Sequence, residues 1–253
     1  MPDFSLVSDS PLKLAALLLC GTLVGMSKTG IQGINTVSIP ILAFAFGAKE
    51  STGLILPMLC FADLLAVAYY RRSAEWKYVL MLLPSALAGF ALALAADSAI
   101  PEGEFKRLMA LCIFAGLGVM FWSRGKSEEA KRRVFSSWWY GPLFGALGGF
   151  TTMIGNAAGP IMAVYLLSMN LPKLAFVGTS AWFFLAVNYL KIPVQIFAWD
   201  NITAASLSAG ALTAPFIIAG AFLGVKFVKW MPEEKYRAFI AAITVISAAL
   251  LLF

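Results

Sequence analysis

The chain has 253 residues, of which 60% are hydrophobic and 13% are charged, whereas charged residues make up about 25% of a typical soluble domain. The mean hydropathy of +0.84 is likewise too high for a soluble domain of this size. The formal net charge is +6, but the basic residues lie between long apolar stretches rather than on one face, which excludes nucleic-acid binding. The composition therefore predicts a polytopic membrane protein. In such a protein the basic residues of the loops indicate how the segments are oriented in the membrane.

Apolar stretches that are long enough to enter a bilayer, about 20 residues each, follow one another along the chain. They cover 11–46, 50–70, 77–96, 105–123, 138–169, 173–190, 203–228 and 236–253. We expect the first stretch to be retained, because Asp3 and Asp9 precede it where a signal peptide has basic residues. These stretches predict an all-α fold with about 8–10 membrane segments.

The two halves of the chain resemble each other. PEGEFKRLMA at 101–110 resembles PEEKYRAFIA at 232–241, and the same offset of 131 residues relates Pro84 to Pro215. Earlier in the halves the offset is 124, where Gly21 and Gly25 correspond to Gly145 and Gly149. We therefore predict a first transmembrane repeat at 1–123, a basic linker at 124–137 (RGKSEEAKRRVFSS) and a second transmembrane repeat at 138–253.

Charge predicts that the repeats are inverted. The basic linker is expected in the cytoplasm, which places 97–104 outside and the basic residues of 71–77 inside. The counterpart of 97–104 is the basic loop 226–235, which is expected inside, so 191–202 is expected outside. Inversion requires an odd number of crossings in each repeat, so 11–46 and 138–169 should each form two crossings or a re-entrant pair. Inverted repeats around a midplane site are typical of secondary transporters.

Both of these leading stretches are interrupted at equivalent places. Residues 25–36 read GMSKTGIQGINT and residues 149–160 read GFTTMIGNAAGP, which is too polar and glycine-rich for a lipid-facing helix. A broken helix exposes backbone N–H groups at the start of its second part, and the helix dipole there favours anions. Two such breaks would form an anion cradle, with Lys28 as its positive charge. The glycine pairs Gly21/Gly25 and Gly145/Gly149 are better explained as helix-packing faces.

Two charged positions have competing interpretations. Lys28 either faces the cavity or extends to the cytoplasmic surface. Asp63, in the middle of 50–70, is a candidate for proton coupling, although it could instead pair with Lys28 or form a structural hydrogen bond between helices. Its counterpart at an offset of 125 is Asn188. Lys191 is expected to anchor a helix end.

Catalysis has no support in the sequence. The chain has no histidine, and Cys20, Cys60 and Cys112 lie inside apolar stretches without a metal-binding spacing. No Walker loop, zinc-protease or nucleophile-elbow motif occurs. We therefore predict that the protein is not an enzyme and has no cofactor and no metal.

The chain resembles the sulfite exporter TauE/SafE family over nearly its whole length. The resemblance rests on GTLVGMSKTGIQGINTVSIPILAFAFGAKESTG in the first half and GALGGFTTMIGNAAGPIMAVYLLSMNLPKLAFVGTSAWFF in the second. It implies a secondary transporter of the bacterial inner membrane that exports small sulfur-containing anions such as sulfite or sulfonates. On this sequence the family's two break regions and following helix starts give the candidate substrate-binding residues Ser27, Lys28, Thr29, Gln32, Asn35, Thr151, Thr152, Asn156, Thr179 and Ser180.

The expected partners are thus a small anion, protons or another coupling ion, and the lipid bilayer. An anion channel and a non-transporting scaffold or subunit are the alternative functions. The sequence leaves the oligomeric state open, with a homo-oligomer among the alternatives.

Overall fold

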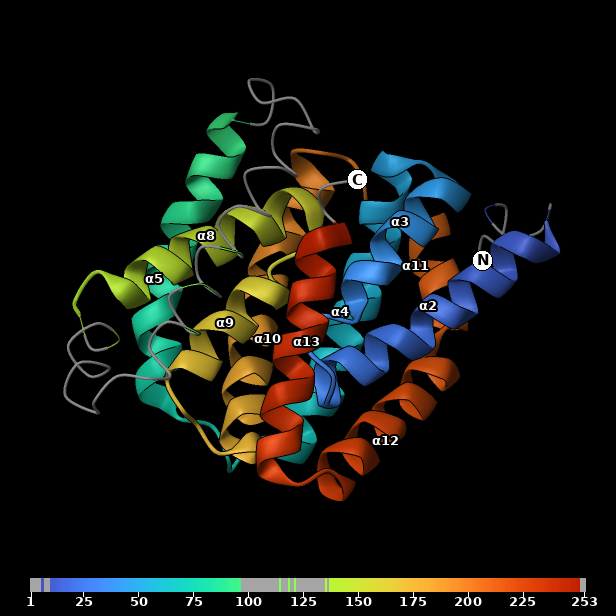
Figure 1. The fold of residues 1–253 in the computed structure, drawn as a ribbon. Helices are drawn as coiled ribbons and strands as arrows, with labels where there is room; N and C mark the ends of the chain where they lie inside the picture. The colour runs from blue at the N-terminus through green and yellow to red at the C-terminus, as the bar shows by residue number, and fades with distance from the viewer. Residues whose placement is uncertain are drawn as a thin grey trace.

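The computed structural model describes residues 10–96 and 137–250, together with a few isolated positions, and every regular element in these ranges is an α-helix (Figure 1). Nearly all of the predicted segment 105–123 and of the linker 124–137 lies outside the described residues. The prediction of an all-α fold is confirmed. The number of membrane segments and the domain boundaries stay predictions.

The helices follow the apolar stretches of the sequence. In the first half they are α2 (Pro11–Thr29), α3 (Asn35–Phe46), α4 (Ala48–Tyr70) and α5 (Trp76–Ala96). In the second half they are α8 (Tyr140–Gly155), α9 (Gly159–Ser168), α10 (Lys173–Phe197), α11 (Ala204–Leu212), α12 (Ala214–Trp230) and α13 (Glu233–Leu250). Within the described residues four helices, at 11–29, 50–70, 76–96 and 173–197, are long and apolar enough to span a membrane. The pair of α11 and α12, bent by 50° at its break, adds a fifth if it is one broken span rather than a re-entrant loop. The protein is therefore a polytopic membrane protein.

Local chemistry explains where several helices begin and end. Pro11 occupies the first turn of α2, where its missing N–H has no helical partner to lose. Gly47 separates α3 from α4 with a φ of +94°, which is in the region that favours glycine. Thr203 and Ser206 form a reciprocal capping box at the start of α11.

Three loops gather at one end of the molecule, which we call the basic end: 71–75, 169–172 and 231–232. The Lys173 amide donates to Glu233 Oε1 at 2.8 Å, and the Lys173 ammonium donates to the Met231 carbonyl at 2.6 Å. The Glu75 amide donates to Thr179 Oγ1 at 2.9 Å. All three loops belong to segments that the charge pattern places in the cytoplasm. The predicted outer loop 191–202 is too long, because residues 191–197 continue α10 and the connection to α11 begins at Ala198.

The two leading helix pairs enter the structure from opposite ends. α2 begins at the end opposite to the basic end, where Lys13 lies over the ring of Phe46 at the end of α3. α8 begins at the basic end, where the Tyr140 hydroxyl donates to Ser168 Oγ at 3.0 Å. The pair α2–α3 therefore runs in the opposite direction to the pair α8–α9, as an inverted repeat predicts.

Close helix packing crosses between the halves, α2 against α12 and α8 against α5 (Figure 1). A Cβ atom on Gly25 would lie 2.2 Å from the Ile217 carbonyl oxygen, and one on Gly149 would lie 2.0 Å from the Ala86 carbonyl oxygen. These contacts correspond to each other at the offsets of 124 and 131 residues read from the sequence. They support the packing role of the glycine pairs and the relatedness of the halves.

The core lies around α9. All of its residues from Pro160 to Ser168 are buried, which explains why this short helix is apolar on every side. α10 and α4 pack against each other beside it. This arrangement places the starts of α3 and α9, and the middles of α4 and α10, at the centre of the protein.

Candidate functional site

The two helix breaks that the sequence predicts lie next to each other. The first break comprises residues 30–34 between α2 and α3, and the second comprises residues 156–158 between α8 and α9. Gly33 has a φ of +95° and Asn156 a φ of 52°, left-handed conformations that glycine and asparagine tolerate best. A Cβ atom on Gly159 would lie 3.5 Å from the Gly33 backbone nitrogen. The N-termini of α3 and α9 therefore meet at the same place.

Side chains from other helices stabilise the first break. The Tyr70 hydroxyl of α4 donates to the Thr29 carbonyl at 3.0 Å, and the Tyr236 hydroxyl of α13 donates to the Gly30 carbonyl at 2.7 Å. Ser247 Oγ donates to the Gly33 carbonyl at 3.1 Å. These bonds satisfy carbonyl groups that an unbroken helix would have paired internally, as irregular backbone at membrane depth requires.

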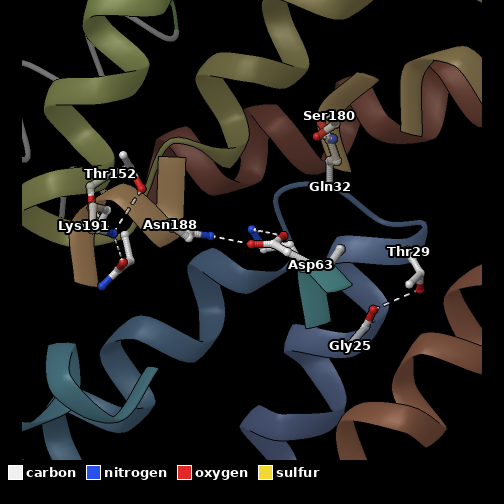
Figure 2. Close-up of polar contacts among 10 residues, drawn as sticks. Gly25, Thr29, Gln32, Asp63, Thr152, Ser180, Asn188 and Lys191 are labelled. Carbon is white, nitrogen blue, oxygen red and sulfur yellow. Dashed lines mark hydrogen bonds and ion pairs between the residues drawn. The ribbon is translucent and has the colours of Figure 1, made fainter. Parts of the chain in front are cut away.

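A small cavity lies between the breaks and α10. Its wall includes seven of the predicted binding residues: Ser27, Lys28, Gln32, Asn35, Thr152, Asn156 and Ser180. Its volume is about 20 Å³, and a buried water molecule needs about 10–15 Å³ on the same measure. The cavity thus has room for about one water molecule, and the side chains around it contact one another closely. The Gln32 amide, for example, donates from Nε2 to Ser180 Oγ (Figure 2).

Lys28 faces the interior and does not extend to the surface. Its ammonium lies 2.9 Å from Asp63 Oδ1, and the side chains of Lys28 and Asp63 are 9% and 0% exposed. The ammonium also lies 4.0 Å from the centre of the Phe184 ring, a favourable cation–π position. Asp63 Oδ2 accepts a hydrogen bond from Asn188 Nδ2 at 2.6 Å (Figure 2). Asp63 therefore forms both the predicted ion pair with Lys28 and a hydrogen bond between helices.

Lys191 is a second buried cation beside the cavity, and its expected role as a helix-end anchor is wrong. Lys191 lies within α10 rather than at its end, and its side chain is fully buried in the protein. The ammonium donates to the Thr152 carbonyl at 2.7 Å, to Thr152 Oγ1 at 3.3 Å and to Asn156 Oδ1 (Figure 2). All three acceptors are neutral oxygen atoms. With two ammonium groups and one carboxylate ionised, Lys28, Lys191 and Asp63 together carry a charge of about +1.

Three predicted binding residues lie away from the cavity. Thr29 Oγ1 donates to the Gly25 carbonyl at 2.9 Å and to the Ala221 carbonyl at 2.8 Å, so it connects α2 to α12. Thr151 Oγ1 donates to the Leu147 carbonyl of its own helix at 2.8 Å. Thr179 faces the loop 71–75 at the basic end, where it accepts from the Glu75 amide.

Several residues of the site are absent from the predicted binding set. Thr36 of the interrupted stretch 25–36, Asn188 (the counterpart of Asp63) and Phe184 belong to the cavity wall, and Lys191 contacts the wall residues Thr152 and Asn156. A signal for Lys191 was present: it follows Asn188 by three residues, which places both on one face of a helix, and the sequence stays mainly apolar to Phe197.

Comparison with known proteins identifies the family. The sequence model of the sulfite exporter TauE/SafE family matches residues 17–251, whereas searches of curated proteins and of solved structures gave no significant match. The match extends over nearly the whole chain and includes both helix breaks, α4 and α10. The chain therefore belongs to the sulfite exporter TauE/SafE family of membrane transporters.

Proposed function

We propose that this protein is a secondary transporter that exports small sulfur-containing anions, such as sulfite and sulfonates including sulfoacetate, across the bacterial inner membrane. The observation that carries the proposal is the cavity at the junction of the two helix breaks, with Lys28 in its wall and Lys191 directly behind it. The family supplies the class of substrate. The cavity supplies a position for the substrate at the centre of the protein.

The electrostatics of the cavity favour an anion. The N-termini of α3 and α9 direct their positive dipole ends toward it, and hydroxyl and amide groups such as those of Ser27 and Asn156 add hydrogen-bond donors. Two buried ammonium groups face one carboxylate, and an excess of buried charge of one sign is expensive unless a counter-ion compensates it. A bound anion compensates that charge.

The size of the cavity favours a gated carrier over an open channel. Sulfite and sulfoacetate are larger than the single water molecule that about 20 Å³ accommodates. The walls must therefore separate before substrate enters. The walls come from both leading helix pairs, so we propose alternating access in which the two halves of the chain move relative to each other around the anion.

The membrane potential supplies a driving force that fits this proposal. A membrane potential that is negative inside favours anion efflux by about 2.3 kcal/mol per charge per 100 mV. Asp63, whose carboxylate holds Lys28, is the proposed site of proton coupling.

Flux measured in proteoliposomes tests the proposed function. Purified protein with sulfoacetate inside the vesicles should accumulate labelled sulfoacetate from outside by saturable counterflow. Lys28→Met should reduce the initial rate at least about tenfold, since a hydrogen bond to a charged group contributes about 1.5–3 kcal/mol. Lys77→Met removes an exposed ammonium from the basic end and serves as the matched control with wild-type flux. Flux without saturation or counterflow indicates the channel alternative, and flux equal to that of protein-free vesicles indicates the scaffold.

A further inference from the structure

Asn188 connects the buried carboxylate of Asp63 to the cavity wall. Its Nδ2 atom donates to Asp63 Oδ2 at 2.6 Å, and the same residue lines the cavity. The other Asp63 oxygen lies 2.9 Å from the Lys28 ammonium, which also lines the cavity. Both groups that contact Asp63 are therefore groups that an anion in the cavity would meet.

The charge of Asp63 determines which amide atom Asn188 turns toward it. An ionised carboxylate only accepts hydrogen bonds, so the Asn188 nitrogen must face Asp63 and its oxygen must face away. Asn188 Oδ1 is buried, and no hydrogen-bond donor among the described residues reaches it. A buried acceptor without a partner is unfavourable, and an acceptor at the cavity wall disfavours an anion. The ionised form of Asp63 thus opposes anion binding in two ways, because it also neutralises Lys28.

We propose that Asn188 is an amide switch that couples protonation of Asp63 to anion binding. Asp63 takes up one proton from the bulk solvent through water that enters the open cavity, and its new O–H group donates to Asn188 Oδ1. The Asn188 amide reverses and presents Nδ2 to the anion. The same proton breaks the ion pair with Lys28, so the charge of Lys28, Lys191 and Asp63 together rises from about +1 to about +2. The reversed amide and the released ammonium both bind the anion.

Charged and titratable groups face Asp63 from several of the helices packed against it. Lys28 of α2 and Lys191 of α10 interact electrostatically with Asp63. Asp63 in turn acts on Tyr189 of α10. Cys60 lies on the same helix as Asp63. α3 and α11 contain no titratable residue, and Lys226 and Lys229 of α12 are exposed. The carboxyl group is therefore the acidic group at the centre of the site.

This inference rests on the proposed function and adds a stoichiometry to it: one proton is bound with each anion. By linkage, the Kd for an anion that does not itself titrate should rise about tenfold per unit of pH over the range in which Asp63 is ionised without ligand and protonated with it. Sulfoacetate is a suitable probe, because its sulfonate is permanently ionised and its carboxyl group titrates near pH 4 (about the value of free carboxyl side chains).

Calorimetric titration with sulfoacetate in buffers of different ionisation enthalpy measures the protons taken up. The wild-type protein should take up about one proton more per anion bound than Asp63→Asn, which should still bind the anion. Infrared difference spectra should show a protonated carboxyl stretch when sulfoacetate is added to the wild type, and Asp63→Asn should lack it. This readout does not depend on any change at Asn188.

The pH profile isolates the role of Asn188. Asn188→Leu should weaken binding at a pH at which the wild type takes up a proton with the anion, because the reversed amide donates to the anion there. It should have little effect at a pH high enough that this uptake has ceased, so the Kd at high pH divided by the Kd at low pH should be smaller than in the wild type. Ser180→Ala, a change elsewhere in the cavity wall, should weaken binding equally at both pH values. Equal weakening by Asn188→Leu, or wild-type binding without proton uptake, overturns the switch. Failure of the wild type to bind sulfoacetate overturns the proposed function itself.

Discussion

The ion pair between Lys28 and Asp63 makes a prediction that separates stability from transport. Lys28→Met removes the cation and leaves a carboxylate that is 0% exposed, with Asn188 as its remaining hydrogen-bond donor. Breaking a buried pair in this way typically costs about 3–5 kcal/mol of folding free energy. Asp63→Asn should cost less, about 1–3 kcal/mol. The reason is that Lys28, whose side chain is 9% exposed, lines the cavity and retains the contact of its ammonium with Phe184.

The double variant Lys28→Met/Asp63→Asn should be nearly as stable as the wild type. It leaves no unpaired charge at these two positions, and replacing a buried ion pair by neutral groups is often close to neutral. Independent effects would instead sum to a loss of about 4–8 kcal/mol, so we expect a coupling energy of about 3 kcal/mol or more. The stable double variant should still lack sulfoacetate counterflow, because the Lys28 cation is absent.

Reversible unfolding of the four proteins in mixed micelles measures this double-mutant cycle. Sulfoacetate should raise the stability of Asp63→Asn more than that of the wild type, because the anion there replaces the missing carboxylate beside Lys28. If the double variant loses as much stability as the two single variants combined, the pair does not hold its charges together in the folded protein. If the double variant transports at the wild-type rate, Lys28 has no part in substrate binding.

Three further predictions concern packing, the second cation and the first break. Gly149→Ala should destabilise the protein by about 1–3 kcal/mol, because its Cβ would lie 2.0 Å from the Ala86 carbonyl oxygen. Gly148→Ala, with its nearest contact at 3.7 Å, should be neutral or stabilise the protein by up to about 1 kcal/mol. Similar thermal stabilities for the two variants would contradict the packing of α8 on α5. Lys191→Met should weaken sulfoacetate binding about tenfold or more in calorimetry, and an unchanged Kd would exclude the second cation from the site. Tyr236→Phe should cost about 1–3 kcal/mol and speed amide hydrogen exchange around the Gly30 break, since the buried carbonyl loses its donor; unchanged exchange there would show that the break is held by other contacts.

The sequence was most informative where it departed from an ordinary membrane helix. Glycine and polar residues inside apolar stretches are a local signal, and they predicted the positions of both breaks. Residues inside the breaks, such as Gln32 and Asn156, consequently line the cavity as expected. The glycine pairs were recognisable for the same reason, since a spacing of four residues defines one face of a helix.

The direction of individual side chains could not be predicted in the same way. Consecutive helical residues point about 100° apart, so Thr29 contacts α12 although Lys28 lines the cavity. Thr151 and Thr179 likewise precede the cavity residues Thr152 and Ser180 and face elsewhere. The role of Lys191 depends on contacts with residues 35 and 39 positions away, which no local pattern reveals.

The central claim is that the cavity between the two helix breaks is the substrate site and opens alternately to both sides of the membrane. A single cysteine tests this claim most directly: Thr36→Cys in a background with Cys20, Cys60 and Cys112 replaced by alanine, labelled with a membrane-impermeant sulfonated thiosulfonate reagent. Pro232→Cys and Ala204→Cys, at positions exposed at the basic end and at the opposite end, are the controls for sidedness.

We predict that the Thr36→Cys variant is labelled from either side and that saturating sulfoacetate prevents the labelling. Each control variant should be labelled from one side, with or without sulfoacetate. Labelling of the Thr36→Cys variant that sulfoacetate does not change, or that occurs from one side only, would contradict the assignment of this cavity as an alternately accessible anion site.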